Sequence, residues 1–272
     1  MKLKILVVVV VVVLAWVAGQ FYSQGAPGGA TTAGNESQLA LSDTEQVIND
    51  SFQLEPGARI EVSGINGPVE VLTIDGQTAD VHLETTARGG ADLESRKLTV
   101  RQTPTGLIVH AESNDGFRFW RWLSGGEVRH HVTLKVPRQI ELSTSGVNGR
   151  VQVGEVTGAV RVSGINGRVE VARATDAVHV SGVNGAVTIG VGELSGEGVR
   201  VSGINGSVEV RFGENLNADV NVNGLNGGFS VNAPNVTTEE PPNRSSRRAR
   251  IGHGGTPISI SGVNGSVRLN RM

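Results

Sequence analysis

Cysteine is absent from this sequence of 272 residues, and aromatic residues make up only 4% of it. Without cysteine the chain has no disulfide bonds, no thiolate nucleophile, no Cys-ligated zinc and no lipid-modified cysteine of the bacterial lipoprotein type. An excess of either charge is also missing, because 24 Lys and Arg residues oppose 26 Asp and Glu residues. This balance provides no general attraction for phosphates, and we expect no nucleic-acid partner.

Sustained helical periodicity is lacking as well. Short stretches such as 69–74 and 132–136 instead alternate apolar and polar residues, which is typical of strands with one buried face. The best helix candidate is the short segment 43–50, in which Asp43 and Thr44 are candidate N-terminal caps. The fold class that these patterns predict is all-β.

Glycine, in contrast, is abundant, with 38 residues, which is about twice its usual share. Much of it belongs to a motif of glycine, an aliphatic residue, asparagine and glycine, usually preceded by serine, as in SGINGRVEV. From 146 to 224 the copies recur every 18 to 21 residues, whereas the first and last intervals are 82 and 38 residues. The first glycines of the seven copies are Gly64, Gly146, Gly164, Gly182, Gly203, Gly224 and Gly262.

Each copy of this motif, taken alone, leaves an apolar face uncovered, so the copies need one another as neighbours. We therefore predict a parallel β-solenoid with rungs of 18–21 residues, in which the strands of successive rungs stack about 4.8 Å apart. The first glycine of each copy is expected at a corner with a left-handed or crowded backbone. The alignment predicts three inward columns: Val160, Val178, Val199 and Val220; Ile165, Val183, Ile204 and Leu225; and Val169, Val187, Val208 and Phe229.

The asparagine of the motif forms the most regular polar column of the alignment. Amides stacked at the spacing of the rungs can hydrogen-bond to one another along the stack, as Asn side chains do in cross-β structures. One interpretation is therefore a structural Asn ladder, and the other is a row of amides that binds a ligand, for instance through sugar hydroxyls. The column comprises Asn66, Asn148, Asn166, Asn184, Asn205, Asn226 and Asn264.

The N-terminal residues predict where the protein resides. Lys2 and Lys4 precede an uncharged apolar run from 5 to 19, the layout of a signal peptide or signal anchor. We assign 1–22 to this segment, through which the chain contacts the membrane whether or not it is then cleaved. The location that follows is extracytoplasmic, in the cell envelope, either membrane-anchored or secreted.

The rest of the chain divides into a linker and one repeat domain. Residues 23–51 are small, polar and aperiodic for most of their length, and we expect a flexible linker. The β-solenoid repeat domain spans 52–272, with a β-rich N-terminal cap and the first rung in 52–139 and the solenoid in 140–272. Within the cap, a hairpin is predicted with its turn at 104–106.

Two insertions offer candidate contact surfaces. Residues 232–255, rich in Arg and Glu, are predicted to be a solvated loop insertion, with a basic docking patch for an anionic envelope polymer or lipid as the alternative. Residues 116–126 concentrate aromatic side chains beside arginines, which suits a packed cap or a contact with a membrane or protein. The candidate contact loop comprises Phe117, Phe119, Trp120, Arg121 and Trp122.

Groups with catalytic potential are sparse. Repetition places like side chains in rows, whereas catalysis needs different groups that converge. The row of Glu170, Thr188 and Glu209 would hold two carboxylates roughly 10 Å apart, near the upper limit for an inverting glycosidase. The adjacent His130 and His131 point to opposite faces of a strand and do not form a chelating pair. We predict no catalytic, cofactor-binding or metal-binding residues.

The order of the motifs resembles that of a known family. A proline-glycine opening at 56–71, the segment VTLKVP at 132–137 and the serial SG[IV]NG units are similar to a bacterial envelope family that carries the name "putative adhesin". The resemblance covers about 50–272 and implies a β-strand-repeat domain of unknown function without assigned catalytic residues. The two insertions at 116–126 and 232–255 depart from the family's pattern.

These observations favour a non-enzymatic envelope protein whose repetitive β-surface serves adhesion, binding or envelope sensing. Its expected partners are an envelope polymer or a membrane protein. Two alternatives stay open: a carbohydrate-active enzyme that acts on an envelope or extracellular polysaccharide, and a regulatory partner of a membrane signalling protein. The oligomeric state and the handedness of the solenoid do not follow from the sequence.

Overall fold

The computed structural model describes residues 44–88, 97–112, 127–192, 194, 197–239, 243 and 245–272. This described part is all-β, its strands are mostly parallel, and it contains no helix. The short helix considered for 43–50 is therefore wrong, because Thr44–Gln53 forms strand β1, which pairs antiparallel with β4 (Thr78–Arg88). Strand β1 includes residues 44–51, which were predicted to belong to the linker.

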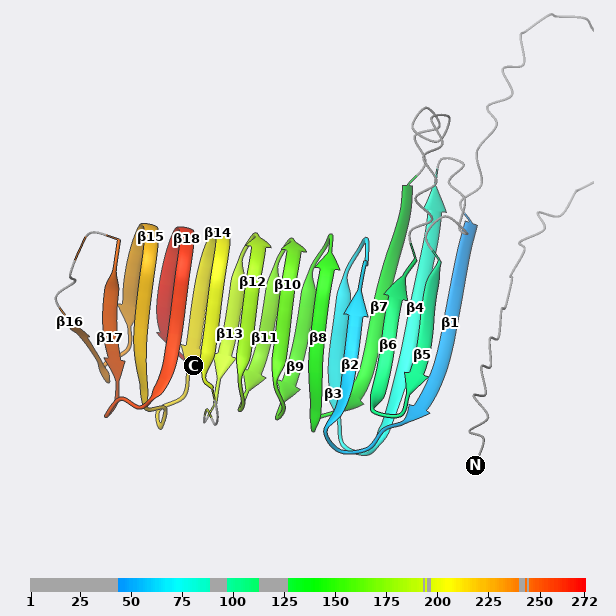
Figure 1. The fold of residues 1–272 in the computed structure, drawn as a ribbon, viewed down its shortest axis with the longest axis horizontal. Coiled ribbons are helices and arrows are strands. Elements are labelled where there is room, and N and C mark those ends of the chain that lie inside the picture. Colours follow the sequence, from blue (N-terminus) through cyan, green and yellow to red (C-terminus); the bar gives the residue numbers. More distant parts are fainter. Residues whose placement is uncertain are drawn as a thin grey trace, which may run out of the picture.

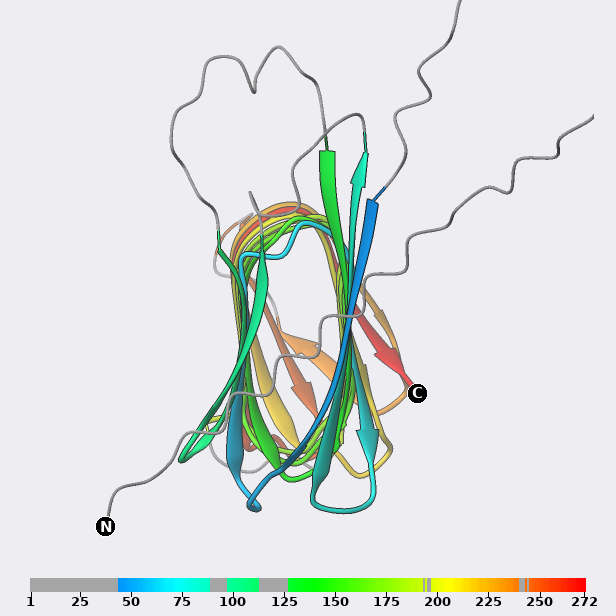
Figure 2. The same ribbon diagram turned by 90° about the vertical axis from the view of Figure 1, so that its right-hand side faces the viewer.

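The strands form two walls that enclose one apolar core, as the view along the stack shows (Figure 2). The chain runs along one wall, turns at the repeated motif and returns along the other. The first wall contains β2 (Ala58–Ser63), β8 (Ile140–Val147), β10 (Val160–Asn166) and β12 (Val178–Asn184). The second contains β3 (Val69–Ile74), β9 (Val151–Val156), β11 (Val169–Ala174) and β13 (Val187–Val191). Three long strands cross the turn and belong to both walls: β14 (Val199–Phe212), β15 (Ala218–Asn232) and β18 (Thr256–Arg271).

Successive rungs pair in parallel, with equivalent residues side by side. Val160 lies beside Val178, Ile165 beside Val183, and Val169 beside Val187 in the register of the walls. The predicted inward columns are buried, with the exception of Phe229, which is only partly covered at the end of the stack. Because side chains alternate between the two faces of a strand, the aliphatic residues at equivalent positions of successive rungs point into the core and lie next to one another.

The order of the last rungs differs from the prediction. We expected Val199 and Val220 to be neighbours, because their motifs are 21 residues apart like those of the preceding pair. Instead β18 lies between β14 and β15 in both walls (Figure 1), so that Ile258 separates Val199 from Val220. The 38-residue interval carries the chain past β15 and then back into a vacant rung position, which β18 fills because it has the same motif.

The N-terminal cap extends both walls beyond the first rung. On the second wall, β7 (Glu127–Pro137) pairs parallel with β3, and β4 and β1 follow antiparallel. On the first wall, β6 (Gly106–Ala111) pairs parallel with β2 and antiparallel with β5 (Leu98–Thr103). The predicted hairpin is confirmed, because Thr103 and Gly106 are paired across its turn. The strands β1 and β4 to β7 therefore form a cap at one end of the stack.

At the opposite end, β16 (Val236–Glu239) and β17 (Arg247–Ile251) form an antiparallel pair. Within 232–255, which we predicted to be a solvated loop, the structure thus contains two strands, of which β16 is largely exposed. Their physical role is visible in the alternation of β17: Ala249 and Ile251 are buried, and β17 pairs with β15 in the first wall. The insertion covers part of the last rung that would otherwise face water.

Candidate functional site

The repeated motif lies along one edge of the stack, where the chain passes from the first wall to the second (Figure 1). The first glycine of each copy has a left-handed backbone, for instance φ of 61° at Gly182 and 64° at Gly203. The second glycine lies against the backbone of the previous rung: a Cβ on Gly185 would be 2.0 Å from the carbonyl oxygen of Gly167. Glycine is thus favoured at the first position by the left-handed backbone, and it is required at the second position by the close contact with the neighbouring backbone.

The asparagines of the motif are joined by side-chain hydrogen bonds along this edge. Each Nδ2 donates to the Oδ1 of the neighbouring rung, and all six bonds run in the same direction. The donor–acceptor pairs are Asn148 to Asn66 (2.8 Å), Asn166 to Asn148 (2.9 Å), Asn184 to Asn166 (3.1 Å), Asn205 to Asn184 (3.0 Å), Asn264 to Asn205 (3.4 Å) and Asn226 to Asn264 (3.1 Å).

The serines of the motif form a second row beside the asparagines. Their residues are half-buried or exposed, and their hydroxyls lie at the same edge of the stack. Ser63 shares a hydrogen bond of 2.9 Å with His110 Nδ1, but no side-chain bond is found for the other five within the described residues. The row comprises Ser63, Ser145, Ser163, Ser181, Ser202 and Ser261, and Asn223 occupies its last position.

Together, the Ser and Asn rows form a surface that we call the Ser–Asn edge. Each inner asparagine donates one amide hydrogen and accepts one bond within its row, so that one N–H and one carbonyl lone pair are left for other partners. The Asn residues other than Asn66 are exposed. The edge thus presents hydroxyl and amide groups at the regular spacing of parallel strands, about 4.8 Å.

His130 closes the N-terminal end of the Asn row. Its residue is 2% exposed, and its Nδ1 accepts a hydrogen bond of 3.2 Å from the backbone N–H of Asn66. The Asn66 amide also donates to the carbonyl oxygen of Val128 at 2.6 Å. The sequence contained a signal for this buried position, because Val128, His130 and Val132 alternate inward along β7. The neighbouring His131 points outward toward Glu84, as expected for adjacent residues of a strand.

The row of carboxylates on the second wall has the predicted register. Glu170 pairs with Thr188, which pairs with Glu209, so two rung spacings separate the carboxylates. Glu209 accepts hydrogen bonds from Arg211 Nε at 2.8 Å and from Asn270 at 2.8 Å. The bond from Arg211 is the main reason why the pKa of Glu209 lies below its usual value. A general acid requires the opposite shift, so Glu209 does not have the raised pKa of the acid in a glycosidase pair.

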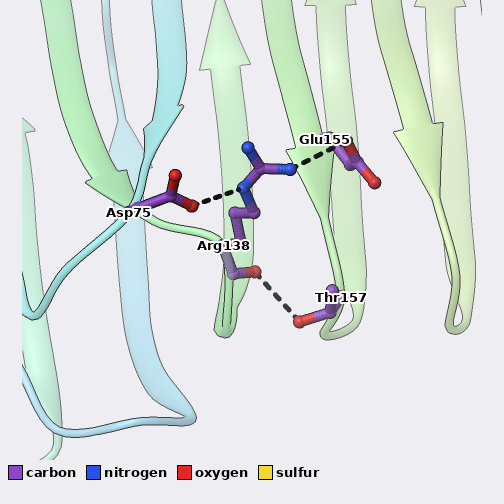
Figure 3. Close-up of polar contacts among 4 residues, drawn as sticks. All are labelled: Asp75, Arg138, Glu155 and Thr157. Atoms are coloured by element: carbon purple, nitrogen blue, oxygen red, sulfur yellow. Dashed lines mark hydrogen bonds and ion pairs between the residues drawn. The ribbon is translucent and has the colours of Figure 1, made fainter.

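A pocket of about 290 Å³ lies where the N-terminal cap meets the first rungs. Its lining includes Leu54 and Arg138. The Arg138 guanidinium donates to Asp75 at 3.1 Å and to Glu155 at 3.0 Å, and the Arg138 carbonyl accepts from the Thr157 hydroxyl (Figure 3). Because two carboxylates already neutralise this guanidinium, the contacts serve to join the cap to the stack.

The candidate contact loop of Phe117, Phe119, Trp120, Arg121 and Trp122 lies outside the described residues, as does the predicted signal segment 1–22. Within the described ranges, no helix has the length and apolar character needed to span a bilayer. No group of three or more His, Asp or Glu side chains in that same part is arranged to hold a metal ion.

No family model and no curated relative matches the chain. Among solved structures, it is similar to a "putative cell adhesion protein" from Clostridium sporogenes, with 10% identity and a TM-score of 0.39 over 83% of this chain and 100% of that one. A "putative adhesin" from Bacteroides fragilis has 14% identity and a TM-score of 0.32, over 83% and 97% of the two chains. A third structure, a "putative adhesin" from Parabacteroides merdae, has 10% identity and a TM-score of 0.23, over 82% of this chain and 95% of that one. The structural neighbours are thus bacterial proteins whose names refer to adhesion.

Proposed function

We propose that this chain is a non-catalytic, extracytoplasmic binding protein of the cell envelope, and that its stacked rungs are a parallel β-solenoid. The observation that carries the proposal is the Ser–Asn edge, a straight and regular surface of hydroxyl and amide groups. A surface of this kind suits a partner with regularly spaced polar groups. We therefore take an envelope polysaccharide as the partner of the edge.

The chemistry of the edge supports binding through many weak contacts. Ser hydroxyls and Asn amides both donate and accept hydrogen bonds, so they can replace the water around sugar hydroxyls without a charged group. A single such bond contributes little net free energy, typically about 1 kcal/mol. Several rungs that bind the same polymer add their contributions, and the later contacts form at a high effective concentration.

The distribution of charged groups argues against catalysis by the described residues. Glu170 and Glu209 are half-buried, and the carboxylate of Glu209 is stabilised in its ionised form by Arg211. Neither residue lines the pocket of about 290 Å³ described above. We therefore place the chain among binding proteins and not among glycosidases.

The extracytoplasmic location rests on the sequence. Lys2 and Lys4, followed by the apolar run 5–19, favour export with the domain on the side opposite the lysines. A location in the envelope would bring the edge close to the wall polymers that it is proposed to bind.

A co-sedimentation assay with insoluble wall polysaccharide tests the proposal. In the edge variant, Ser163→Gln, Ser181→Gln and Ser202→Gln cover the middle of the edge with longer side chains. We expect this variant to bind at least several-fold more weakly than the unmodified chain, with little change in its melting temperature. Binding of undiminished strength would refute a role of the edge.

Matched variants separate the alternatives. Glu170→Gln with Glu209→Gln changes the second wall and should leave binding intact; loss of polymer hydrolysis in this variant would instead favour the enzyme. Trp120→Ser with Trp122→Ser tests the candidate contact loop. If that loop were the contact surface, this variant alone would lose binding while its melting temperature stayed constant.

A further inference from the structure

Strand β18 occupies an unusual place in the chain's path. The strand that precedes it, β17, lies on the far side of β15, so the chain must cross β15 to reach the position of β18 (Figure 1). In the described part of the chain β15 pairs with β17 and β18, and β18 alone pairs with both β14 and β15. If β18 left its position, β14 and β15 would each lose the strand with which they pair on that side, and the rung position between them would be vacant.

This position, which we call the slot, is selective for a segment with the repeated motif. On one side, a Cβ at Gly265 of β18 would be 1.9 Å from the carbonyl oxygen of Gly206. On the other side, a Cβ at Gly227 of β15 would be 1.6 Å from the carbonyl oxygen of Gly265. A strand in the slot must therefore have glycine at this point and an aliphatic residue two positions before and after it, as Val263 and Val267 are placed.

The crossing itself has the features of a hinge. Residues 252–255 include three glycines with positive φ, namely 58° at Gly252, 79° at Gly254 and 139° at Gly255. The crossing is held by a backbone bond from the Gly252 N–H to the Asn235 carbonyl oxygen (2.9 Å) and by two side chains, Asn217 and Asp219. Asn217 Oδ1 accepts from the His253 N–H at 2.8 Å, and Asp219 Oδ2 accepts from the Gly255 N–H at 3.0 Å. A few exposed polar bonds thus keep the hinge in its present conformation, and such segments open before the core does.

We propose that the slot accepts β18 of a second copy of this chain, so that neighbouring copies can exchange this strand. We assign a second copy as the occupant because its segment 256–271 has the same sequence as β18, and therefore has glycine and aliphatic residues at the positions that the slot requires. Closed and exchanged forms make the same wall contacts, so the local concentration of chains and the hinge conformation decide between them. Exchange would link copies that are crowded on one surface, which adds a self-association activity to the proposed binding function and does not depend on it.

Cysteine variants can report the exchange, because the chain has no cysteine of its own. Ser202 and Ser261 are paired side by side in β14 and β18. One full-length chain carries Ser202→Cys, and a second, made longer by a purification tag, carries Ser261→Cys. The two are unfolded together in urea, refolded together over a range of concentrations, oxidised and separated by non-reducing electrophoresis. The tag gives the mixed dimer a mass of its own.

The matched control is a mixture of Ser163→Cys and Ser181→Cys chains, which carry the same substitution in the same row. These residues are also paired side by side, but in β10 and β12, which follow one another in the winding. We expect a several-fold excess of mixed dimer from the 202/261 mixture, which rises with protein concentration. Equal yields from the two mixtures would overturn the proposal. A single chain with both Ser202→Cys and Ser261→Cys should form an internal disulfide, which verifies that the reporter pair can react.

Discussion

The side-chain amide of Asn226 donates to Asn264, which follows it by 38 residues, and not to Asn205, which precedes it by 21. Asn264 in turn donates to Asn205, so that the last motif copy in the sequence is the last but one in the stack. The bond between these two side chains thus shows that the order of the strands in space differs from their order in the sequence at this end of the molecule.

Cysteine pairs should confirm this order. Ser202, Ser261 and Asn223 lie in successive strands of one row. Ser261→Cys with Asn223→Cys should form a disulfide, since neighbouring parallel strands are about 4.8 Å apart. Ser202→Cys with Asn223→Cys should not, because two strand spacings exceed the reach of a disulfide. Rapid oxidation of the second pair, followed by thiol titration, would show that β15 lies directly on β14.

The two glycines of one motif copy should differ in their tolerance of alanine. At Gly182 a Cβ has room, with Gly164 N at 3.6 Å, and only the left-handed backbone costs about 1–2 kcal/mol. At Gly185 the Cβ would lie 2.0 Å from a backbone oxygen, so Gly185→Ala should cost more than roughly 4 kcal/mol or prevent folding. Thermal unfolding of both variants provides the comparison. Gly182→Asn serves as the control, because Asn tolerates the left-handed region better than Ala does. Similar losses at 182 and 185 would contradict the distinction.

Thr144→Val should stabilise the protein. Thr144 is buried between Val62 and Val162 in an otherwise apolar column, and its hydroxyl has no hydrogen-bond partner. A buried polar group without a partner costs about 1–3 kcal/mol, and valine has nearly the same shape as threonine. We expect a higher melting temperature, whereas Ser145→Ala on the outer side of the same strand should change it little. A lower melting temperature for the valine variant would imply that the hydroxyl is bonded.

Acid should loosen the crossing at 252–255. The Gly255 N–H, followed by the Arg250 guanidinium at 3.2 Å, holds the pKa of Asp219 below its ordinary value of 3.8. A carboxyl group whose pKa is lower in the folded than in the unfolded state stabilises the fold when the pH is above the pKa of the unfolded state. This stabilisation is lost as the pH falls through the pKa of the folded state. The urea midpoints of the unmodified chain and Asp219→Asn should therefore differ at pH 5–7 and converge below pH 3.8.

Asp176→Asn is the control for that experiment, because the Asp176 carboxylate has no ion pair or hydrogen bond in the described part of the chain. Its urea midpoint should follow that of the unmodified chain at every pH. A constant difference between the unmodified chain and Asp219→Asn down to pH 2 would show that Asp219 acts through something other than its charge.

The sequence predicted the walls well because their information is local. Val160, Val178 and Val199 occur at the same place in each motif copy, and the period of two assigns them to the same side of successive strands. The left-handed glycines could also be predicted, since only glycine fits a corner of that geometry in every copy.

The order of the last strands could not be predicted in the same way. The edges of β14 and β18 present almost the same side chains, so β15 could pair with either, and the equal 21-residue intervals favoured the wrong one. The order of these strands depends on contacts between residues that are far apart in the sequence. Strand β17 pairs with β15, and the side chains of Asn217 and Asp219 hold residues 253–255, where the chain crosses β15. The polar stretch 247–251 showed no sign of this role, because only Ala249 and Ile251 are apolar in it.

The place of β18 also has a consequence for biosynthesis. Rungs that stack in sequence order can be added one at a time as the chain emerges, N-terminal end first, from the ribosome or from an export channel. Here β15 is synthesised before β18, the strand that pairs with it and joins it to the stack. The pairing of β15 with the stack is therefore possible only after residues 256–271 have been synthesised. A chain released before residue 256 would lack the strand that joins β15 to β14, and the edge of β14 that β18 covers in the complete protein would stay open to proteases.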